Sequence, residues 1–374
     1  MGRYRWGFAI GLLAVTVKTM AQNDPQSVFS KLPQAKEGDC VIENFKFLNG
    51  QVLRRLKIHY LTAGRLTRDA NGNATNAVLV LHGTTGRALE FMTPSYSGEL
   101  FGAGQPLDAS KYFLIIPDDI GHGDSSKPSD GLRNSFPKYV YADMVAAQHQ
   151  VVSKHLQIQH LELVTGISMG GMHSWIWAEE YPGMMDAVIP IASEPRRITG
   201  RNLLWRRILI EAVRRDPTYH DGNYSEQPQS YKSIWPMFHM MDDSPRHLEQ
   251  LVPDTEQALA YIDDRLQVGH APVDANDAIY AFDASRDYDP EPKLNDIRAR
   301  VLAINFADDE LNPVALGALE RLMPRVHRGS YVIIPGSKET HGHMTLILAG
   351  IWKQHVANLL PSLESVRSPG HSHF

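Results

Sequence analysis

The chain has 374 residues, a formal net charge of −5 and a single cysteine, Cys40. Its length allows one large domain or two small ones, and 43% hydrophobic residues are enough to bury a sizeable core. The small negative charge makes neither nucleic acid nor an anionic membrane surface an expected partner. A lone cysteine excludes a disulfide framework and a cysteine-built zinc site.

The first 21 residues have the pattern of a secretory signal peptide. Arg3 and Arg5 precede an apolar run over 7–17, and a cleavage-site pattern ends at Ala21. The run is too short to span a bilayer comfortably, so cleavage is favoured over an uncleaved membrane anchor. We therefore expect a periplasmic or secreted mature chain that is not stably inserted in a membrane.

Eight short segments have the patterns of strands. Residues 41–48 and 52–61 alternate between apolar and polar, and the Asn49-Gly50 pair between them is typical of a hairpin. The others are continuous apolar runs bounded by loop residues, as expected for strands buried on both faces. These runs lie at 77–81, 112–117, 161–164, 187–191, 301–306 and 331–334.

Helical spacing occurs between these runs, most clearly over 139–156, where apolar residues recur every three to five positions. Further helices are expected at 169–181, 314–322 and 344–360. Strands that alternate with helices imply right-handed crossovers and a mostly parallel sheet. The predicted fold class is therefore α/β.

The alternation stops between residues 194 and 289, where no strand is expected and 203–213 and 248–266 have helical spacing. We interpret this stretch as a helical lid over the C-terminal edge of the sheet. Its tryptophans and methionines are expected in the lid core, and Arg206 and Arg207 on solvated faces. The predicted organisation is a signal peptide (1–21), a first core part (22–193), a helical lid (194–289) and a second core part (290–374).

The segment Gly166-Ile167-Ser168-Met169-Gly170 follows a predicted strand and opens a predicted helix. In that context it has the pattern of a nucleophile elbow, G-x-S-x-G. A sharp strand-to-helix turn strains the serine backbone and leaves no room for side chains at the glycine positions. The helix N-terminus brings the N–H of Met169 close to a developing oxyanion. Ser168 is therefore the candidate nucleophile.

A serine hydroxyl needs a base, and with a nucleophile elbow the acid and then the histidine follow the serine along the chain. Asp308 and Asp309 follow the run 301–306, and His341 and His343 follow the next run. Both loops should reach the sheet edge beside the nucleophile. His343 follows a glycine and opens the last helix, which favours it over His341. The residues alone leave both acids as candidates.

In proteins with a nucleophile elbow, the loop after an earlier strand supplies a second oxyanion N–H. The loop from His82 to Gly86 has that position here. We assign this donor to Thr84, with Thr85 as the alternative. His82 is expected to hold the loop without a catalytic role.

The predicted chemistry requires no metal and no organic cofactor. The pairs His341/His343 and His371/His373 lack a convincing further ligand. The predicted partner is a small-molecule acyl substrate. The oligomeric state stays open, with a homodimer as one option.

Several motifs resemble the homoserine O-acetyltransferase-like branch of the α/β-hydrolases. The segment Ser168-Met169-Gly170-Gly171-Met172 is fairly specific to that branch. The similarity spans about residues 40–360, and it implies the α/β-hydrolase fold, with helices on both faces of the sheet and a helical lid insertion. Further matching segments are Phe136-Pro137, Asp143-Met144-Val145, Gln148, Trp177-Ala178, Tyr181-Pro182, Asp274-Ala275-Asn276, Tyr280 and Asp287-Tyr288.

The resemblance implies roles by position. The branch's nucleophile matches Ser168, and its Gly-His base matches His343. Its Asp-x-Leu-x-Pro motif selects Asp309 from the two candidate acids. Its oxyanion loop again indicates the N–H of Thr84.

The sequence departs from the branch where the substrate binds. The branch's arginine for the amino-acid carboxylate matches Ile210, and its aspartate after the catalytic histidine matches Met344. Two apolar residues predict a pocket for a neutral or apolar group, unless the lid count has slipped by one turn toward Arg206, Arg207 or Arg214. An export signal is also unusual for an acetyl-CoA-dependent enzyme.

The sequence therefore predicts an exported serine hydrolase that cleaves a carboxylic ester or similar acyl compound through an acyl-serine intermediate. One alternative is an acyl-CoA-dependent O-acyltransferase that uses the same intermediate. Another is a non-catalytic binding protein built on the same scaffold.

Overall fold

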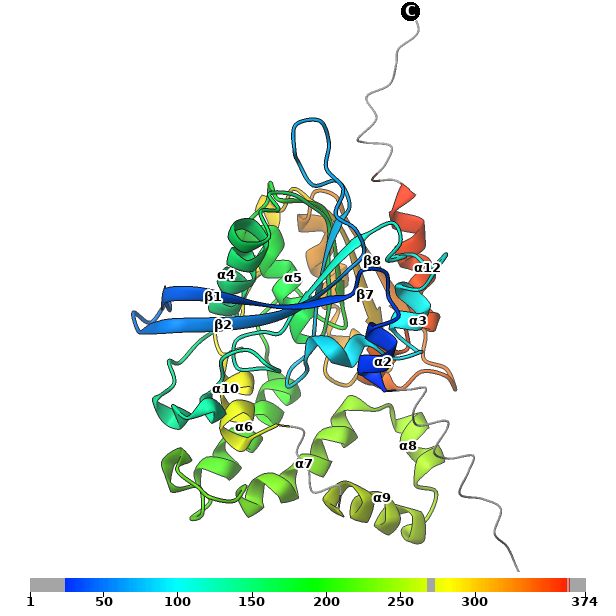
Figure 1. Ribbon diagram of the computed structural model, residues 1–374. Helices are drawn as coiled ribbons and strands as arrows, with labels where there is room; N and C mark the ends of the chain where they lie inside the picture. Colours follow the sequence, from blue (N-terminus) through cyan, green and yellow to red (C-terminus); the bar gives the residue numbers. More distant parts are fainter. Residues whose placement is uncertain (1–23, 268–272, 362, 364–374) are drawn as a thin grey trace, which may run out of the picture.

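An eight-stranded sheet runs through the centre of the computed structural model, which describes residues 24–267, 273–361 and 363 (Figure 1). The predicted signal peptide lies outside these residues. The strand order is β1-β2-β4-β3-β5-β6-β7-β8. The strands are β1 (Lys36–Lys46), β2 (Val52–Ala63), β3 (Ala77–Leu81), β4 (Phe113–Pro117), β5 (Leu161–Ile167), β6 (Met185–Ile191), β7 (Arg300–Phe306) and β8 (Gly329–Ile334).

The predicted hairpin is confirmed. β1 and β2 pair antiparallel, and the turn between them has Gly50 at a φ of 86°, in the left-handed region that glycine tolerates. β2 also pairs antiparallel with β4, whereas every later pairing in the sheet is parallel. The parallel strands match the continuous apolar runs, because both of their faces are covered.

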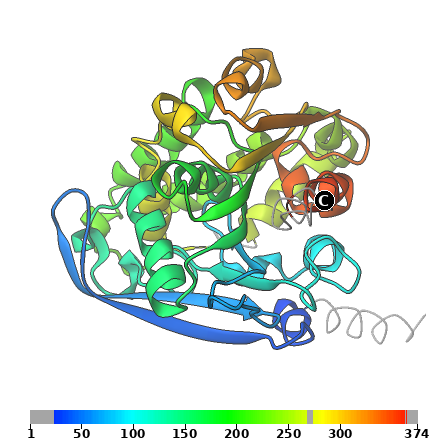
Figure 2. The ribbon, with the colours of Figure 1, turned by 90° about the horizontal axis from the view of Figure 1, so that it is seen from above.

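Helices cover both faces of the sheet (Figure 2). Alternate residues of the central strands therefore pack into two separate cores. Leu79 and Val164 face the core formed with α4 (Tyr141–Gln150) and α5 (Met169–Glu180). Their neighbours on the strands face the core formed with α12 (Ala349–Leu359). The remaining helices of this part are α2 (Pro25–Phe29), α3 (Ser97–Leu100) and α11 (Ala318–Leu322).

The chain between β6 and β7 forms the lid, whose helices gather at one end of the sheet (Figure 1). The described part of this stretch contains no strand. Its helices are α6 (Gly200–Arg214), α7 (Gln229–Asp242), α8 (Pro245–Leu251), α9 (Thr255–Gln267) and α10 (Ala275–Asp283).

The lid differs from the prediction over 248–266, where two helices replace the single one expected. Pro253 disfavours helical backbone at Val252, which ends α8 with a ψ of 62°. The Asp254 carboxylate then accepts the N–H groups of Glu256 and Gln257 and starts α9.

The last predicted helix also divides, into a 3₁₀ segment over Gly342–Ile347 and α12. Among the described residues, no helix combines the length and the apolar character needed to cross a bilayer.

Candidate active site

Ser168 occupies the turn between β5 and α5, with a φ of 51° that is strained for a residue with a side chain. The glycines of the motif are required by close backbone approach. A Cβ on Gly166 would lie 2.4 Å from the carbonyl of Gly170, and one on Gly170 would lie 2.1 Å from the carbonyl oxygen of Leu81. The turn therefore has the geometry that the motif predicts.

Three predicted site residues are joined by hydrogen bonds. His343 Nε2 lies 2.9 Å from the Ser168 hydroxyl, and His343 Nδ1 lies 2.7 Å from Asp309 Oδ2. An ionised Asp309 accepts a hydrogen bond from Nδ1–H, which leaves Nε2 to accept a hydrogen bond from the Ser168 hydroxyl. The Asp309 carboxylate is itself fixed by the N–H of Leu311 and the side-chain amide of Asn312.

Burial and charge act in opposite directions on this pair. Burial alone would lower the pKa of His343, but the Asp309 carboxylate and its hydrogen bond raise that pKa above its ordinary value. Burial would likewise raise the pKa of Asp309, and the imidazole and the other donors hold it below its ordinary value. Asp309 is thus ionised near neutral pH and favours protonation of His343.

Asp308 and His341, the alternative candidates for the acid and the base, contact other residues. Asp308 accepts a hydrogen bond from the Thr340 hydroxyl at 2.7 Å. His341 stacks on His247 of α8, with 3.7 Å between the ring centroids. Among these acids and histidines, Asp309 and His343 are therefore the two joined to the nucleophile.

The predicted oxyanion loop lies against the nucleophile, because a Cβ on Gly83 would be 3.6 Å from the Ser168 Cβ. Among the described residues, the N–H of Thr84 has no acceptor. Met169 opens α5, so its N–H has no carbonyl one turn earlier in the helix. Both groups are available near Ser168, and their role as oxyanion donors stays a prediction.

His82 holds this loop, as expected. Its Nδ1 donates to the carbonyl of Gly83 at 2.8 Å, and its Nε2 accepts from the N–H of Asp119 at 3.0 Å. The Asp119 carboxylate is buried beside His173 and Gln148, a polar layer that the sequence analysis missed. The sequence signal for this layer was the acidic pair Asp118-Asp119, which directly follows the strand run 112–117.

A cavity of about 170 Å³ opens onto the nucleophile. The core side of this cavity includes the oxyanion loop, Ser168, Leu311 and His343. Met344, Leu346 and Ile347 lie on the same side. The lid side consists of Trp205, Arg206, Trp235, Asp242 and Phe282.

The lid side corrects two predictions. Arg206 is 3% exposed and lines the cavity, so it does not lie on a solvated face. Met344 lines the cavity as an apolar residue, but Ile210 is buried in the lid core. The pocket also contains Asp242, so its lining is not wholly apolar, and the preference for a neutral or apolar group stays a prediction.

Asp242 is a titratable group inside the cavity. Burial raises the pKa of this carboxyl to about 7, with a further contribution from Asp309, while His343 and Arg206 oppose the shift. Asp242 is therefore only partly ionised near neutral pH.

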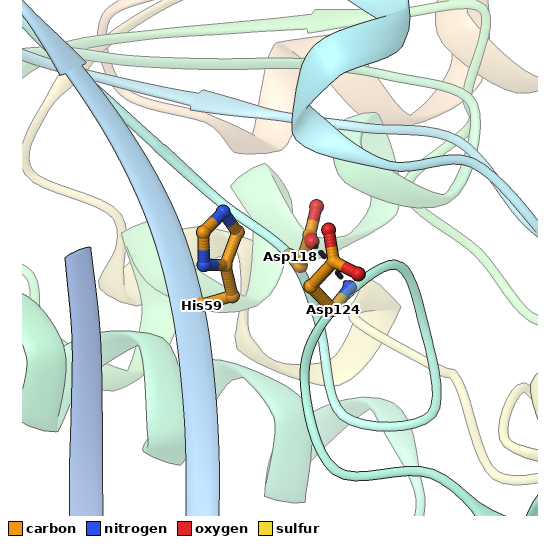
Figure 3. Close-up of side chains that lie close together, drawn as sticks. All are labelled: His59, Asp118 and Asp124. Carbon is orange, nitrogen blue, oxygen red and sulfur yellow. Dashed lines mark hydrogen bonds between the residues drawn. The ribbon is translucent and has the colours of Figure 1, made fainter. Parts of the chain in front are cut away.

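One group of metal-ligand type residues lies in the described part of the chain (Figure 3), and none of its three members lines the cavity. His59, Asp118 and Asp124 offer ligand atoms within 4.8 Å of one another. Both oxygens of Asp118 already accept backbone N–H groups, from Ala88 and Asp124. His59 Nδ1 is bonded to Asp39. These contacts hold the loop after β4 against β2 and the loop after β3.

Comparison with known proteins identifies the class. The family model for the alpha/beta hydrolase fold matches residues 76–339, which is more than half of the chain. The chain belongs to this family.

Its relatives and structural neighbours are acyltransferases and esterases. A probable acyltransferase of Methanothermobacter thermautotrophicus is 28% identical over 287 residues, covering 76% of this chain and 86% of the relative. A homoserine O-succinyltransferase of Magnetococcus marinus is 32% identical over 194 residues, or 48% of each chain. The chain thus spans about half the length of the second relative.

Two solved structures share the fold over 87% of this chain and 97% of theirs. Homoserine O-acetyltransferase from Bacillus anthracis superposes with a TM-score of 0.75 at 22% identity. The acetyl esterase MekB superposes with a TM-score of 0.74 at 23% identity. Within the family, the chain is similar to the homoserine O-acetyltransferase-like branch, and it is an esterase-like or acyltransferase enzyme.

Proposed function

We propose that this protein is an exported serine hydrolase that cleaves a carboxylic ester, or a similar acyl compound, through an acyl-serine intermediate. The observation that carries the proposal is the continuous hydrogen-bond path from Ser168 through His343 to Asp309 at the edge of the cavity. This arrangement activates a hydroxyl that is otherwise a weak nucleophile.

In the first half of the reaction, Ser168 Oγ attacks the acyl carbon while His343 Nε2 accepts its proton. Asp309 holds the imidazole in the correct tautomer and stabilises the imidazolium. The N–H groups of Thr84 and Met169 donate to the oxyanion, and each such donor contributes about 3 kcal/mol of transition-state stabilisation. His343 then delivers the proton to the departing alcohol, and the acyl group stays on Ser168.

In the second half, His343 deprotonates a water molecule that attacks the acyl-serine carbonyl. The second oxyanion is held by the same donors. Its collapse returns the proton to Ser168 and releases the carboxylic acid. Every proton transfer therefore uses one nitrogen, the Nε2 that lies 2.9 Å from the hydroxyl.

The proposal is tested by covalent labelling and by turnover. A fluorophosphonate should label the wild-type protein at Ser168 and leave Ser168→Ala unlabelled. A panel of p-nitrophenyl esters of graded chain length should then show Ser168-dependent hydrolysis. Absence of both labelling and hydrolysis in a folded protein would support the non-catalytic alternative instead.

An acyltransferase is the second candidate, and the charged lid side of the cavity favours it. Arg206 and Asp242 provide opposite charges that an alcohol acceptor with ionic groups could use. Acetyl-CoA and homoserine are the direct test. Efficient, Ser168-dependent formation of O-acetylhomoserine would replace the hydrolase proposal, whereas release of free acetate supports it.

Export is the remaining part of the proposal and is supported by the N-terminal pattern of Arg3, Arg5 and the apolar run over 7–17. Intact mass measurement of the protein from the periplasm or the medium should find a chain beginning at Gln22. A full-length chain confined to the cytoplasm would contradict export without affecting the enzyme assignment.

A further inference from the structure

The oxyanion donor proposed in the loop after β3 shares a peptide unit with a carbonyl group that is held on its other side. This unit joins Gly83 to Thr84, and in a planar trans peptide the C=O and the N–H point in opposite directions. The Gly83 carbonyl accepts hydrogen bonds from Nδ1–H of His82 at 2.8 Å and from the N–H of Gly86 at 3.0 Å. The N–H of Thr84 therefore points away from His82, and no acceptor among the described residues uses it.

His82 donates from Nδ1 because Asp119 occupies its other ring nitrogen. The backbone N–H of Asp119 donates to Nε2 at 3.0 Å, so this nitrogen acts as an acceptor. A neutral imidazole with one acceptor nitrogen carries its proton on the other nitrogen, which is the tautomer that the Gly83 carbonyl requires. His82 is 1% exposed, so both contacts are shielded from solvent.

The carboxylate of Asp119 fixes the place of this backbone N–H. Its Oδ1 accepts a hydrogen bond from the side-chain amide of Gln148 on α4, and its Oδ2 lies 3.4 Å from Nδ1 of His173 on α5. Gln148 is fixed in turn, because its Oε1 accepts a hydrogen bond from Trp177 Nε1 at 2.7 Å. Burial alone would raise the pKa of Asp119, but His173 holds that pKa below its ordinary value. The carboxylate is therefore ionised and anchored from two helices.

The same buried layer contacts the helix that carries the other proposed oxyanion donor. His173 lies one helical turn after Met169 on α5, so the two residues share a side of that helix. Asp119 thus contacts both the loop that carries Thr84 and the helix that carries Met169. Two donors stabilise an oxyanion only when both reach the same oxygen at about 2.7–3.1 Å. The spacing between loop and helix is therefore part of the machinery.

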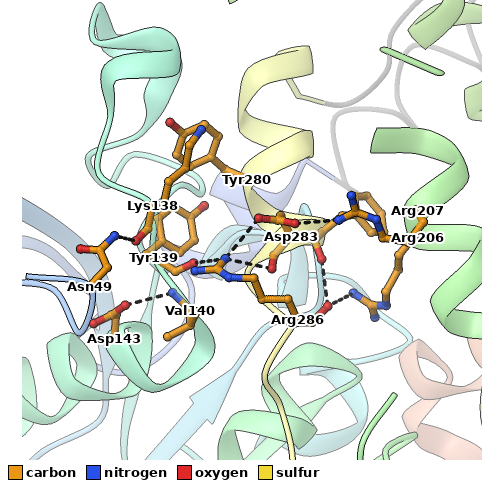
Figure 4. A network of polar contacts seen from close by, with 12 residues as sticks. Asn49, Lys138, Tyr139, Val140, Asp143, Arg206, Arg207, Tyr280, Asp283 and Arg286 are labelled. Atoms are coloured by element: carbon orange, nitrogen blue, oxygen red, sulfur yellow. Dashed lines mark hydrogen bonds and ion pairs between the residues drawn. The ribbon is translucent and has the colours of Figure 1, made fainter. Parts of the chain in front are cut away.

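Asp143 is a buried acid that lacks this connection (Figure 4). Its carboxylate accepts the N–H of Leu48 at 2.8 Å and the N–H of Val140 at 3.0 Å, at the start of α4. It is 3% exposed, close to the 1% of Asp119. Asp143 therefore distinguishes the loss of a buried acid from an effect on the oxyanion hole.

We propose that His82 and Asp119 are positioning residues for the oxyanion hole. Asp119 fixes the tautomer and the place of His82, and His82 directs the N–H of Thr84 toward the oxyanion. This rests on the proposed acyl-serine mechanism and adds two residues to it. Neither residue lines the cavity, so neither touches the substrate. Their effect falls on the charge that develops in the transition state, and not on the binding of the neutral ester.

Two substitutions of His82 separate the roles of its ring nitrogens. The amide nitrogen of an asparagine reaches the place of Nδ1, whereas that of a glutamine reaches the place of Nε2. His82→Gln should lower kcat for p-nitrophenyl acetate by about 10- to 100-fold and leave KM within about threefold, because a misdirected donor weakens only the transition state. His82→Asn should restore most of the rate. Asp119→Ala should resemble His82→Gln, and Asp143→Ala is the matched control that should keep the wild-type kcat.

A ketone that forms an oxyanion without turnover gives a second measurement. Ser168 Oγ adds to the carbonyl carbon of trifluoroacetone, its proton passes to His343, and the ketone oxygen becomes the oxyanion. The inhibition constant should rise in His82→Gln and Asp119→Ala by about the factor by which kcat/KM falls. The pH midpoint of kcat/KM should keep its wild-type value, because His343 and Asp309 are unchanged. An unchanged inhibition constant, an unchanged kcat or a shifted midpoint in these variants would overturn the proposal.

Crystal structures separate this proposal from the proposed function. If the wild-type protein neither hydrolyses esters nor binds trifluoroacetone, the hydrolase proposal fails, and the direction of the Thr84 N–H still decides the role of His82. A peptide plane that turns in His82→Gln and Asp119→Ala, but not in Asp143→Ala, supports the positioning role. The same plane in all of these structures overturns it. Asp119→Ala carries the test if His82→Gln does not fold.

Discussion

The two sides of the cavity differ in how their charged groups are held. On the core side, His343 and Asp309 are bonded to each other and to Ser168. On the lid side, Arg206 and Asp242 face the same space without an ion pair between them. The catalytic pair of the core side is thus joined by direct hydrogen bonds, whereas Arg206 and Asp242 interact across the cavity through charge. The predicted catalytic residues follow strand ends, whereas Arg206 and Asp242 belong to the lid helices.

Removing the nucleophile should cause the largest loss of activity among the changes on the core side of the cavity. Ser168→Ala should lower kcat/KM for p-nitrophenyl acetate by about 10⁵-fold or more, and His343→Ala should lower it nearly as much. The double variant should be little worse than either single one, because the residues act as a unit. His341→Ala is the matched control, since His341 stacks on His247. If His341→Ala abolished activity and His343→Ala did not, the base would be misassigned.

Removing the charge of the acid should cost less, because nucleophile and base remain. Asp309→Asn is expected to lower kcat by about 10³- to 10⁴-fold, since the imidazolium loses its partner and the tautomer is no longer fixed. Asp308→Asn, which changes a carboxylate bonded to Thr340, should stay within a factor of ten. Steady-state kinetics of the two variants decide the point. Equal losses would mean that the core side depends on both acids.

The difference between the core side and the lid side of the cavity also explains which site residues could be predicted from the sequence. Ser168, His343 and Asp309 follow strand ends, and parallel strands bring their carboxyl ends to one edge whatever the details of packing. The glycines beside Ser168 mark a turn with one backbone geometry. Choosing Asp309 over Asp308 needed the Asp-x-Leu-x-Pro resemblance, because adjacent acids look alike in a single sequence.

The sequence predicted that the lid is helical, but it did not predict where each lid helix ends or which lid residues line the cavity. Arg206 and Arg207 are neighbours, and a shift of one position along α6 exchanges a buried charge for an exposed one. The first residue of that helix is not marked by a side-chain cap. Pro253, which divides 248–266 into two helices, was a signal that the helical spacing obscured. Asp242 had no motif at all, since its place in the cavity depends on how α7 packs.

Tight packing around the nucleophile predicts a stability difference between two glycines. Gly170→Ala should destabilise the protein by about 3 kcal/mol, because its Cβ would meet the carbonyl oxygen of Leu81 at 2.1 Å. Gly183→Ala is the control, since nothing lies within 4 Å of its Cβ and the change should stay within about 0.5 kcal/mol. Chemical denaturation measures both. Equal stability of the two variants would show that the turn can relax.

The smallest expected effect couples the two sides of the cavity through charge. His343 accepts a proton only when it is neutral, and its pKa is raised above the ordinary value of 6.5 by Asp309 and, more weakly, by Asp242. For a neutral ester, kcat/KM should therefore rise with pH through a midpoint above 6.5. Asp242→Asn removes one of the charges that favour the imidazolium, so its midpoint should move to lower pH. Asp243→Asn is the control, because that carboxylate pairs with His247 at 2.7 Å. An Asp242→Asn midpoint that matched wild type would show that the lid does not act on the base, and that the two sides of the cavity work independently.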